Sequence, residues 1–250
     1  MSGHSKWSTI KRKKGAADAK RGKIFSKIIK EITVAARLGG GDPGGNPRLR
    51  HALLEARAAN MPADNMERAI KKGTGELEGI EYEELLYEGV GIAGTLVLVE
   101  TMTDNRNRTN PELRRVFEKN GGQLGAGGSA AWAFDQKGQV RLDANAADEE
   151  TLFEVAVGAG AEDVVLEGDE WLITTARESL DAVGTALEEA EVSVKKSALA
   201  RIAKTSKTLL GDDGRRMLAL LEALEDHDDV QNVFSDFEPS DALLAELAAE

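Results

Sequence analysis

Apolar residues recur at helical intervals near the start of this chain. Between residues 16 and 38 they stand one, three and four positions apart, at Ile24, Phe25, Ile28, Ile29, Ile32, Ala35 and Ala36. This spacing predicts a helix with one apolar face. At about 100° per residue, the opposite side carries Lys20, Lys23, Lys27 and Lys30. The pattern therefore predicts a helix that packs on one side and presents positive charge on the other.

Two further helices are predicted before residue 75. The glycine-rich segment 39–45 favours a flexible linker. Asn46 and Pro47 then supply an N-cap and a first helical residue, which predicts a helix that runs to about residue 60. A third helix is predicted over residues 62–73, where a glycine ends it. We expect these three helices to form a bundle.

From residue 80 the pattern changes to alternating strands and helices. The predicted order is strand 82–90, strand 94–102, helix 111–120 and strand 129–134, completed much later by helix 212–225 and strand 230–236. Between these two parts the chain predicts strand 139–143, helix 148–158, strands 163–167 and 170–174, helix 176–190 and strand 191–196. The inserted order is βαββαβ, which is typical of a ferredoxin-like fold.

The fold class predicted from these elements is a multidomain α+β protein. Its predicted parts are a basic three-helix bundle at 1–75, a discontinuous α+β domain at 80–135 plus 205–238, an inserted βαββαβ domain at 136–204 and an acidic tail helix at 239–250.

Charge is divided unevenly between these parts. Residues 1–75 hold 17 Lys and Arg against 6 Asp and Glu, whereas residues 76–250 hold 15 against 38. A basic head of net charge +11 therefore precedes an acidic body of net charge −23. Such asymmetry suggests a nucleic-acid partner.

Composition narrows the class of protein further. Without cysteine there can be no disulfide, no thiolate metal site and no cysteine nucleophile, which fits a reducing compartment. We find no apolar run long enough to span a membrane and no apolar stretch of the kind a secretory signal requires. We expect a cytoplasmic protein without membrane association and, as its oligomeric state, a monomer.

The head supplies the first candidate site. Basic side chains neutralise phosphates, and a flat ring can stack on an unpaired base. The residues expected to contact nucleic acid are His4, Lys6, Trp7, Lys11, Arg12, Lys13, Lys14, Lys20, Arg21, Lys23, Lys27 and Lys30. A basic run of this kind can also be a solvated tail, but its continuation into an amphipathic helix favours binding.

A second candidate lies in the body, where residues 103–109 read Thr-Asp-Asn-Arg-Asn-Arg-Thr between a predicted strand and a helix expected to start at Asn110 and Pro111. As a loop before a helix N-terminus it could bind an anion or a partner through Asp104, Asn105, Arg106, Asn107 and Arg108. Alternatively, the loop could be a turn whose arginines pair with acidic neighbours. We expect an external anion, because a helix N-terminus gains little from added cations.

Two other segments suggest chemistry less strongly. The glycine-rich stretch 121–128 follows a helix and precedes a strand, the reverse of a phosphate-binding loop, so we expect flexible or closely packed backbone there. The acidic stretch 225–229 is expected to be a solvated turn, because no second ligand cluster accompanies it. No catalytic motif is recognisable, and we expect neither an enzyme nor a metal or cofactor.

Several segments together resemble the YebC family, which includes the mitochondrial translational activator of cytochrome c oxidase. The resemblance rests on His4-Ser-Lys-Trp7 with Ile10-Lys11, Asp18-Ala-Lys-Arg-Gly-Lys-Ile-Phe25, Gly41-Asp-Pro43, Asn46-Pro-Arg-Leu-Arg50, Ala58-Ala-Asn-Met-Pro62, Glu67-Arg-Ala-Ile-Lys-Lys-Gly73, Thr103-Asp-Asn-Arg-Asn-Arg-Thr109 and Asp228-Asp-Val-Gln-Asn-Val233.

This resemblance implies a three-helix bundle followed by two ferredoxin-like α+β domains. It also implies one of two functions. Members are described as DNA-binding transcriptional regulators, which would make promoter DNA the partner; others resemble ribosome-associated factors that contact rRNA or tRNA and relieve stalling on proline-rich sequences. We expect the ribosomal role, with DNA-binding transcriptional regulation as the alternative, because no helix presents Asn, Gln and Arg in the manner of a major-groove reader.

Overall fold

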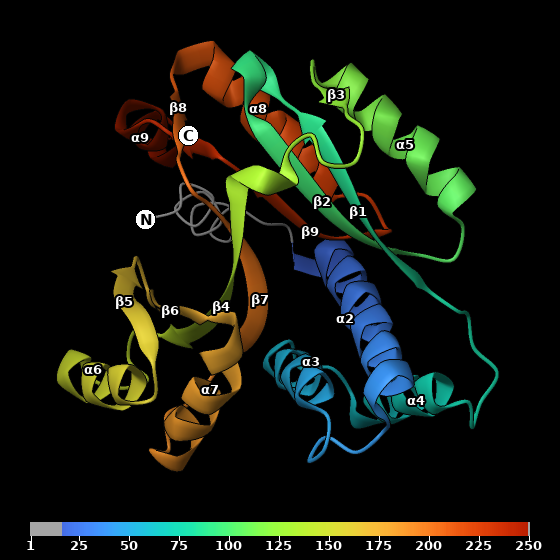
Figure 1. Ribbon diagram of the computed structural model, residues 1–250, viewed down its shortest axis with the longest axis vertical. Helices are drawn as coiled ribbons and strands as arrows, with labels where there is room; N and C mark the ends of the chain where they lie inside the picture. The colour runs from blue at the N-terminus through green and yellow to red at the C-terminus, as the bar shows by residue number, and fades with distance from the viewer. Residues whose placement is uncertain (1–16, 250) are drawn as a thin grey trace. The chain divides into compact units, whose positions relative to one another are not determined.

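A computed structural model describes residues 17–249, with side chains described over 22–247. The chain forms two compact units. One contains residues 17–23, 81–135 and 202–249; the other contains 24–80 and 136–201. The prediction of a multidomain α+β protein that begins with three helices is confirmed (Figure 1). Because the second unit contains both the bundle and the inserted sheet, the proposed three-domain boundaries stay a prediction.

The three predicted helices are α2 (Ala17–Gly39), α3 (Pro47–Ala58) and α4 (Ala63–Thr74). Their shared core contains Ile28, Ile32, Leu49, Leu53 and Ala69. The predicted cap of α3 is confirmed: the Asn46 side chain accepts a hydrogen bond from Leu49 N at 3.1 Å and donates to the carbonyls of Ala35 and Gly40 at 2.8 Å each. One buried asparagine thus joins the end of α2 to the start of α3.

Close contact between α2 and α4 depends on a glycine. A Cβ at Gly73 would lie 2.4 Å from the backbone oxygen of Thr33, a distance that side chains do not tolerate. The glycine that the sequence suggested as a helix end therefore lies within α4 and serves helix packing, and the left-handed residue that ends α4 is Gly75.

The first sheet belongs to the unit built from residues 81–135 and 202–249. It has the strand order β3-β1-β2-β9, formed by β1 (Glu83–Val90), β2 (Leu96–Thr103), β3 (Gln123–Leu124) and β9 (Val230–Ser235), all paired antiparallel. A short 3-10 turn, η1 (Ile92–Gly94), joins β1 to β2.

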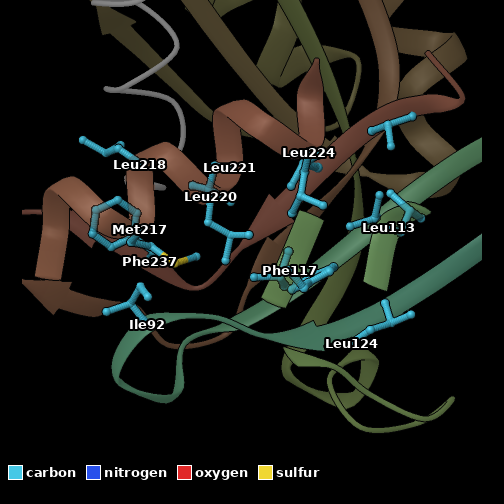
Figure 2. Close-up of a cluster of buried hydrophobic side chains, with 14 of the residues drawn as sticks. Ile92, Leu113, Phe117, Leu124, Met217, Leu218, Leu220, Leu221, Leu224 and Phe237 are labelled. Carbon is cyan, nitrogen blue, oxygen red and sulfur yellow. The ribbon is translucent and has the colours of Figure 1, made fainter. Parts of the chain in front are cut away.

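Helices α5 (Arg106–Lys119) and α8 (Gly211–Glu225) cover one face of this sheet. Their buried side chains include Leu113, Phe117, Met217 and Leu221, which pack with the inward residues of β2 and β9 (Figure 2). On β2, Val97 and Val99 face this core, whereas Leu98 between them faces a second cluster. Both faces of β2 are therefore buried.

The second sheet has the order β5-β6-β4-β7. Its strands are β4 (Phe134–Asp143), β5 (Ala161–Glu167), β6 (Glu170–Ala176) and β7 (Lys196–Ala203), with helices α6 (Glu149–Gly158) and α7 (Leu180–Glu189) between them and a 3-10 turn, η3 (Arg177–Ser179), before α7. Chain order and strand order together give the ferredoxin-like arrangement predicted for the inserted segment. Its core contains Leu142, Leu152, Ile173 and Leu187.

Three short elements complete the fold. Strands β8 (Lys207–Leu209) and β10 (Phe237–Pro239) pair in parallel, and α9 (Asp241–Ala249) follows them, as expected for the tail. Neither β8, β10 nor β3 was predicted, because two or three residues give no periodic signal.

Two predicted strands were wrong. In place of the strand predicted at 129–134, residues 131–133 form a 3-10 turn, η2 (Ala131–Ala133). The strand predicted at 139–143 is present but longer than expected, since it begins already at Phe134. The strand predicted at 191–196 begins instead at Lys196, because Glu191 has a positive φ of 59° after α7 and Val192 is buried in the core as a loop residue.

No helix within residues 17–249 is long and apolar enough to cross a membrane.

Candidate functional site

Most of the basic head lies outside the described residues. This holds for His4, Lys6, Trp7, Lys11, Arg12, Lys13 and Lys14. Lys20 and Arg21 lie in the first turns of α2, where only the backbone is described. The head therefore stays a prediction at these positions.

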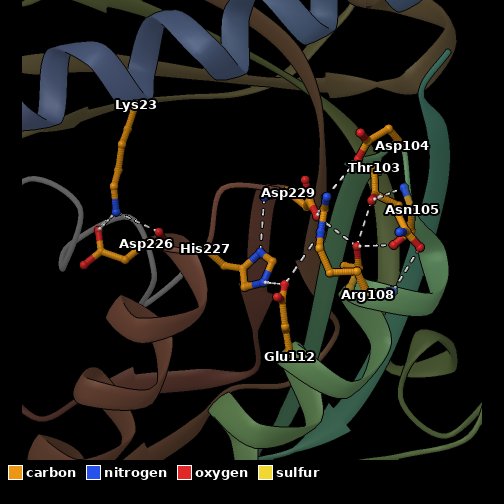
Figure 3. Close-up of polar contacts among 10 residues, drawn as sticks. Lys23, Thr103, Asp104, Asn105, Arg108, Glu112, Asp226, His227 and Asp229 are labelled. Atoms are coloured by element: carbon orange, nitrogen blue, oxygen red, sulfur yellow. Dashed lines mark hydrogen bonds and ion pairs between the residues drawn. The ribbon is translucent and has the colours of Figure 1, made fainter. Parts of the chain in front are cut away.

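Three predicted lysines are described on α2. Lys23 is exposed, and its Nζ donates to the carbonyl of Asp226 at 2.9 Å (Figure 3). Lys27 and Lys30 are half-buried rather than fully exposed. The helical pattern was correct, but part of the predicted cationic stripe already contacts the protein.

The second candidate site does not have the predicted local structure. Residues 106–108 are not a loop but the first turn of α5, which begins five residues before the predicted start at Pro111. Asn105 is the N-cap, since its side chain accepts a hydrogen bond from Arg108 N at 3.1 Å. Pro111 lies within the helix, where its missing N–H removes one backbone hydrogen bond without ending the helix.

A buried carboxylate organises this turn. Asp229 is 4 % exposed and accepts hydrogen bonds from Arg108 Nη2 and Thr109 Oγ1, each at 2.8 Å. The Thr103 hydroxyl, 2.8 Å from Thr109 Oγ1, donates in turn to Thr109, so the end of β2 is joined to the start of α5. The expectation that residues 225–229 form a solvated turn is therefore wrong for Asp229, because two side chains from the other polar segment satisfy its charge.

Arg108 is held by three carboxylates. Besides Asp229, its guanidinium contacts Asp104 at 2.9 Å and Glu112 at 3.9 Å. The hydrogen bond and charge of Asp229, followed by those of Asp104, raise the pKa of Arg108 above its ordinary value. For Arg108 the structure therefore agrees with the second interpretation of residues 103–109, in which the arginines pair with acidic neighbours of the same chain. The anion expected at this helix N-terminus is provided, for Arg108, by the chain itself.

His227 also belongs to the hydrogen-bond network around Asp229. Its Nδ1 accepts a hydrogen bond from Asp229 N at 3.2 Å, and its Nε2 lies 3.1 Å from Glu112 Oε2. The two polar segments that the sequence presented separately, 103–109 and 225–229, thus form one network across β2, α5 and the turn before β9.

Arg106 differs from Arg108, although it stands on the same turn. Its side chain is 68 % exposed, and Glu83 is 4.0 Å away. The binding of an external anion by Arg106 stays a prediction.

A further feature was missed by sequence reasoning. The Glu88 carboxylate, in a residue 7 % exposed on β1, accepts hydrogen bonds from the backbone N–H groups of Gly128 and Ala130 at 2.6 Å each and of Ala131 at 2.8 Å. The next residue, Trp132, is 66 % exposed, and its indole donates to Ser129 O at 3.2 Å. The glycine-rich stretch therefore ends in a pinned turn that displays an aromatic ring. The sequence signal that could have indicated this turn is Glu88 itself, a glutamate at an inward-facing position of the strand predicted at 82–90.

Candidate metal ligands are not clustered in the part of the chain that the structure describes. Within those residues no group of three or more His, Asp or Glu side chains is arranged to hold a metal ion.

Comparison with known proteins covers almost the whole chain. The family model described as the TACO1/YebC protein N-terminal domain matches residues 5–76, and the one described as the TACO1/YebC second and third domain matches 82–237.

Two relatives carry the name probable transcriptional regulatory protein. The one from Desulfatibacillum aliphaticivorans is 53 % identical over 97 % of this chain and 99 % of its own length. The one from Geobacter sulfurreducens is 55 % identical over 96 % of this chain and 97 % of its own length. A crystal structure of a conserved hypothetical protein from Aquifex aeolicus is similar with a TM-score of 0.84 and 45 % identity, covering 90 % of this chain and 93 % of that one.

Proposed function

The chain belongs to the TACO1/YebC family, and we propose that it is a non-enzymatic regulatory protein that binds nucleic acid mainly through phosphate contacts. The observation that carries this proposal is the separation of charge, +11 over residues 1–75 against −23 over the remainder. A phosphate backbone attracts the first part and repels most of the second. The head would therefore set the orientation of the complex.

The contacts proposed within the head are the basic residues and rings named above, from His4 to Lys30. Removal of any one phosphate-contacting lysine is expected to weaken binding about equally for all sequences and to lower the salt slope by about one. Trp7→Ala is expected to cost roughly 1–3 kcal/mol of binding free energy if the indole stacks on a base. If Trp7 packs in the bundle instead, the variant lowers the melting temperature and leaves the affinity of the folded fraction unchanged.

DNA-bound transcriptional regulation is the role that the relatives' names support. In this role the protein would sit on promoter DNA and alter transcription of nearby genes. Binding dominated by phosphate contacts would give it little sequence specificity of its own.

A ribosome-associated role is the second candidate, in which the protein contacts rRNA or tRNA and relieves stalling on proline-rich sequences. The observation that favours it is Trp132, an exposed ring on a turn fixed by Glu88. Unpaired RNA bases stack on such rings, whereas the bases of duplex DNA are already stacked on one another.

Two measurements on the same cells separate these roles. Sedimentation of the protein with polysomes, lost after RNase treatment, is expected for the ribosomal role. Discrete peaks of chromatin occupancy are expected for the transcriptional role. A chain that shows neither, and that binds neither RNA nor DNA in vitro, would refute the proposed function.

A further inference from the structure

Helix α5 carries an unusual concentration of positive charge. All five Lys and Arg residues between Glu81 and Asp135 lie on it, at positions 106, 108, 114, 115 and 119, in a segment with nine Asp and Glu residues. The unit to which α5 belongs is otherwise acidic, so the cations do not reflect overall composition.

Three of these cations, Arg114, Arg115 and Lys119, lie away from the inner side of the helix. The inner side is formed by Thr109, Leu113 and Phe117, each 0 % exposed. At about 100° per residue, Arg115 and Lys119 fall within roughly 60° of the direction opposite to these residues. Arg114 stands on the flank, and all three are exposed. Arg115 and Lys119 are one turn apart, about 6 Å along the axis.

Arg114, Arg115 and Lys119 form no ion pair within the part of the chain that the structure describes, although the exposed Glu118 stands on the same side of α5. Over residues 22–247 none of them makes an ion pair or a side-chain hydrogen bond, in contrast to Arg108 on the same helix. Like charges four residues apart destabilise a helix by roughly 0.2–0.5 kcal/mol, which opposes the favourable interaction of Lys119 with the C-terminal end of α5.

A further cation extends this surface beyond the end of α5. Gly121 follows the helix with a φ of +78°, and a Cβ there would lie 2.9 Å from Arg216 Nη2 on α8. The Arg216 side chain, 52 % exposed, therefore reaches the C-terminal end of α5 while one of its nitrogens lies 3.5 Å from Asp213. Arg216 thus places a cation next to Gly121, beyond the end of α5.

We propose that the outer face of α5, formed by Arg114, Arg115 and Lys119, is a second phosphate-binding surface for nucleic acid, separate in sequence from the basic head. This inference rests on the proposed function, since it assigns the same kind of partner to another surface. Charge complementarity selects the partner: the face presents exposed cations, with arginine at two of three positions, and guanidinium groups match phosphate geometry well.

The test uses the full-length chain with charge-neutralising pairs. The α5 variant is Arg115→Gln/Lys119→Gln. The control is Lys137→Gln/Arg215→Gln, which removes the same charge from a half-buried and an exposed cation that already contact Glu162 at 2.7 Å and Glu246 at 2.5 Å. A head variant, Lys11→Gln/Lys13→Gln, reports on the proposed function alone.

Fluorescence anisotropy is measured over a range of KCl concentrations with two labelled probes, a 20-nucleotide single-stranded RNA and a 20-base-pair DNA duplex. The α5 variant is expected to reduce the slope of log K against log[salt] by about 1.4 on RNA or 1.8 on DNA, and to keep the wild-type melting temperature. The control pair is expected to leave the slope unchanged.

The outcomes separate the two proposals. If the wild type binds and the head variant weakens binding, but the α5 variant matches the wild type in affinity and slope, the second surface is refuted while the proposed function stands. An equal loss in the α5 and control variants also refutes it, because the effect would then be one of net charge. Failure of the wild type to bind either probe refutes both.

Discussion

The network around Asp229 permits a quantitative test of what Arg108 does. Arg108→Ala removes a charge-assisted hydrogen bond to a side chain that is 5 % exposed, and such bonds contribute about 1.5–3 kcal/mol. Because the Arg108 side chain is itself 43 % exposed, solvent screening reduces this, and we expect a loss of about 1–2 kcal/mol in the free energy of unfolding. Asp229→Ala removes the carboxylate that accepts from both Arg108 and Thr109 and is expected to cost about 2–4 kcal/mol.

The assay is a double-mutant cycle measured by urea unfolding at neutral pH. If the two side chains interact directly, the double variant is expected to lose about 1–2 kcal/mol less than the sum of the single variants. Raising the ionic strength is expected to reduce this coupling energy in part, because the Arg108 side chain is exposed to solvent and its charge is screened by salt, whereas Asp229 is buried.

Arg106→Ala is the matched control, because Arg106 stands on the same helical turn, with its nearest carboxylate partner 4.0 Å away. It is expected to change stability by less than about 0.5 kcal/mol. The reasoning fails if Arg108→Ala is as mild as Arg106→Ala, or if the cycle shows no coupling. Arg108 would then be available to an external anion after all.

Three other changes test separate parts of the structure. Glu88→Ala removes the acceptor of three backbone N–H groups and is expected to cost about 2–4 kcal/mol and to alter Trp132 emission; unchanged emission and stability would contradict the pinned turn. Asn46→Ala removes the α3 cap and two further hydrogen bonds, so we expect a loss of about 2–3 kcal/mol, measured as a lower urea midpoint, whereas a loss below about 0.5 kcal/mol would show the cap to be dispensable. Burial raises the pKa of Asp236, so the folded chain binds this proton more tightly than the unfolded chain, and the stabilising effect is lost as pH rises through the folded pKa. Asp236→Asn cannot ionise, so its melting temperature is expected to rise relative to that of the wild type as the pH increases from about 4 through the folded pKa of Asp236; a constant difference would contradict the shift.

Elements with a local signal could be predicted from the sequence. The helix after Asn46 and Pro47 begins where its cap and proline place it, because both act through neighbouring backbone groups. The βαββαβ order of the inserted segment was also visible, since each helix and strand there is long enough to show its own period.

The candidate site could not be predicted in the same way. Asn105 and Asn110 are equally good caps, and Pro111 favours the second of them by local rules. The contact that distinguishes them comes from Asp229, 120 residues beyond Thr109.

The position of β9 in the first sheet has a consequence for how the chain folds during synthesis. β9 pairs with β2, and Asn232 and Glu100 on these strands are 132 residues apart in sequence. The segment between them contains the second sheet, in which the entering and leaving strands, β4 and β7, are neighbours. If that sheet folds first, it brings the two ends of the insertion together and roughly halves the flexible loop, which lowers the entropy cost of closure by about 0.6 kcal/mol.

Until residues 230–235 leave the ribosome, the edge of β2 has no partner strand. Its side chains Val97, Leu98 and Val99, each 0 % exposed in the finished fold, lie next to unpaired backbone groups at that stage. Such an edge can pair with other chains. The last tenth of the polypeptide therefore protects a strand made during the first half of its synthesis, and a chain that ends before Val230 is expected to aggregate.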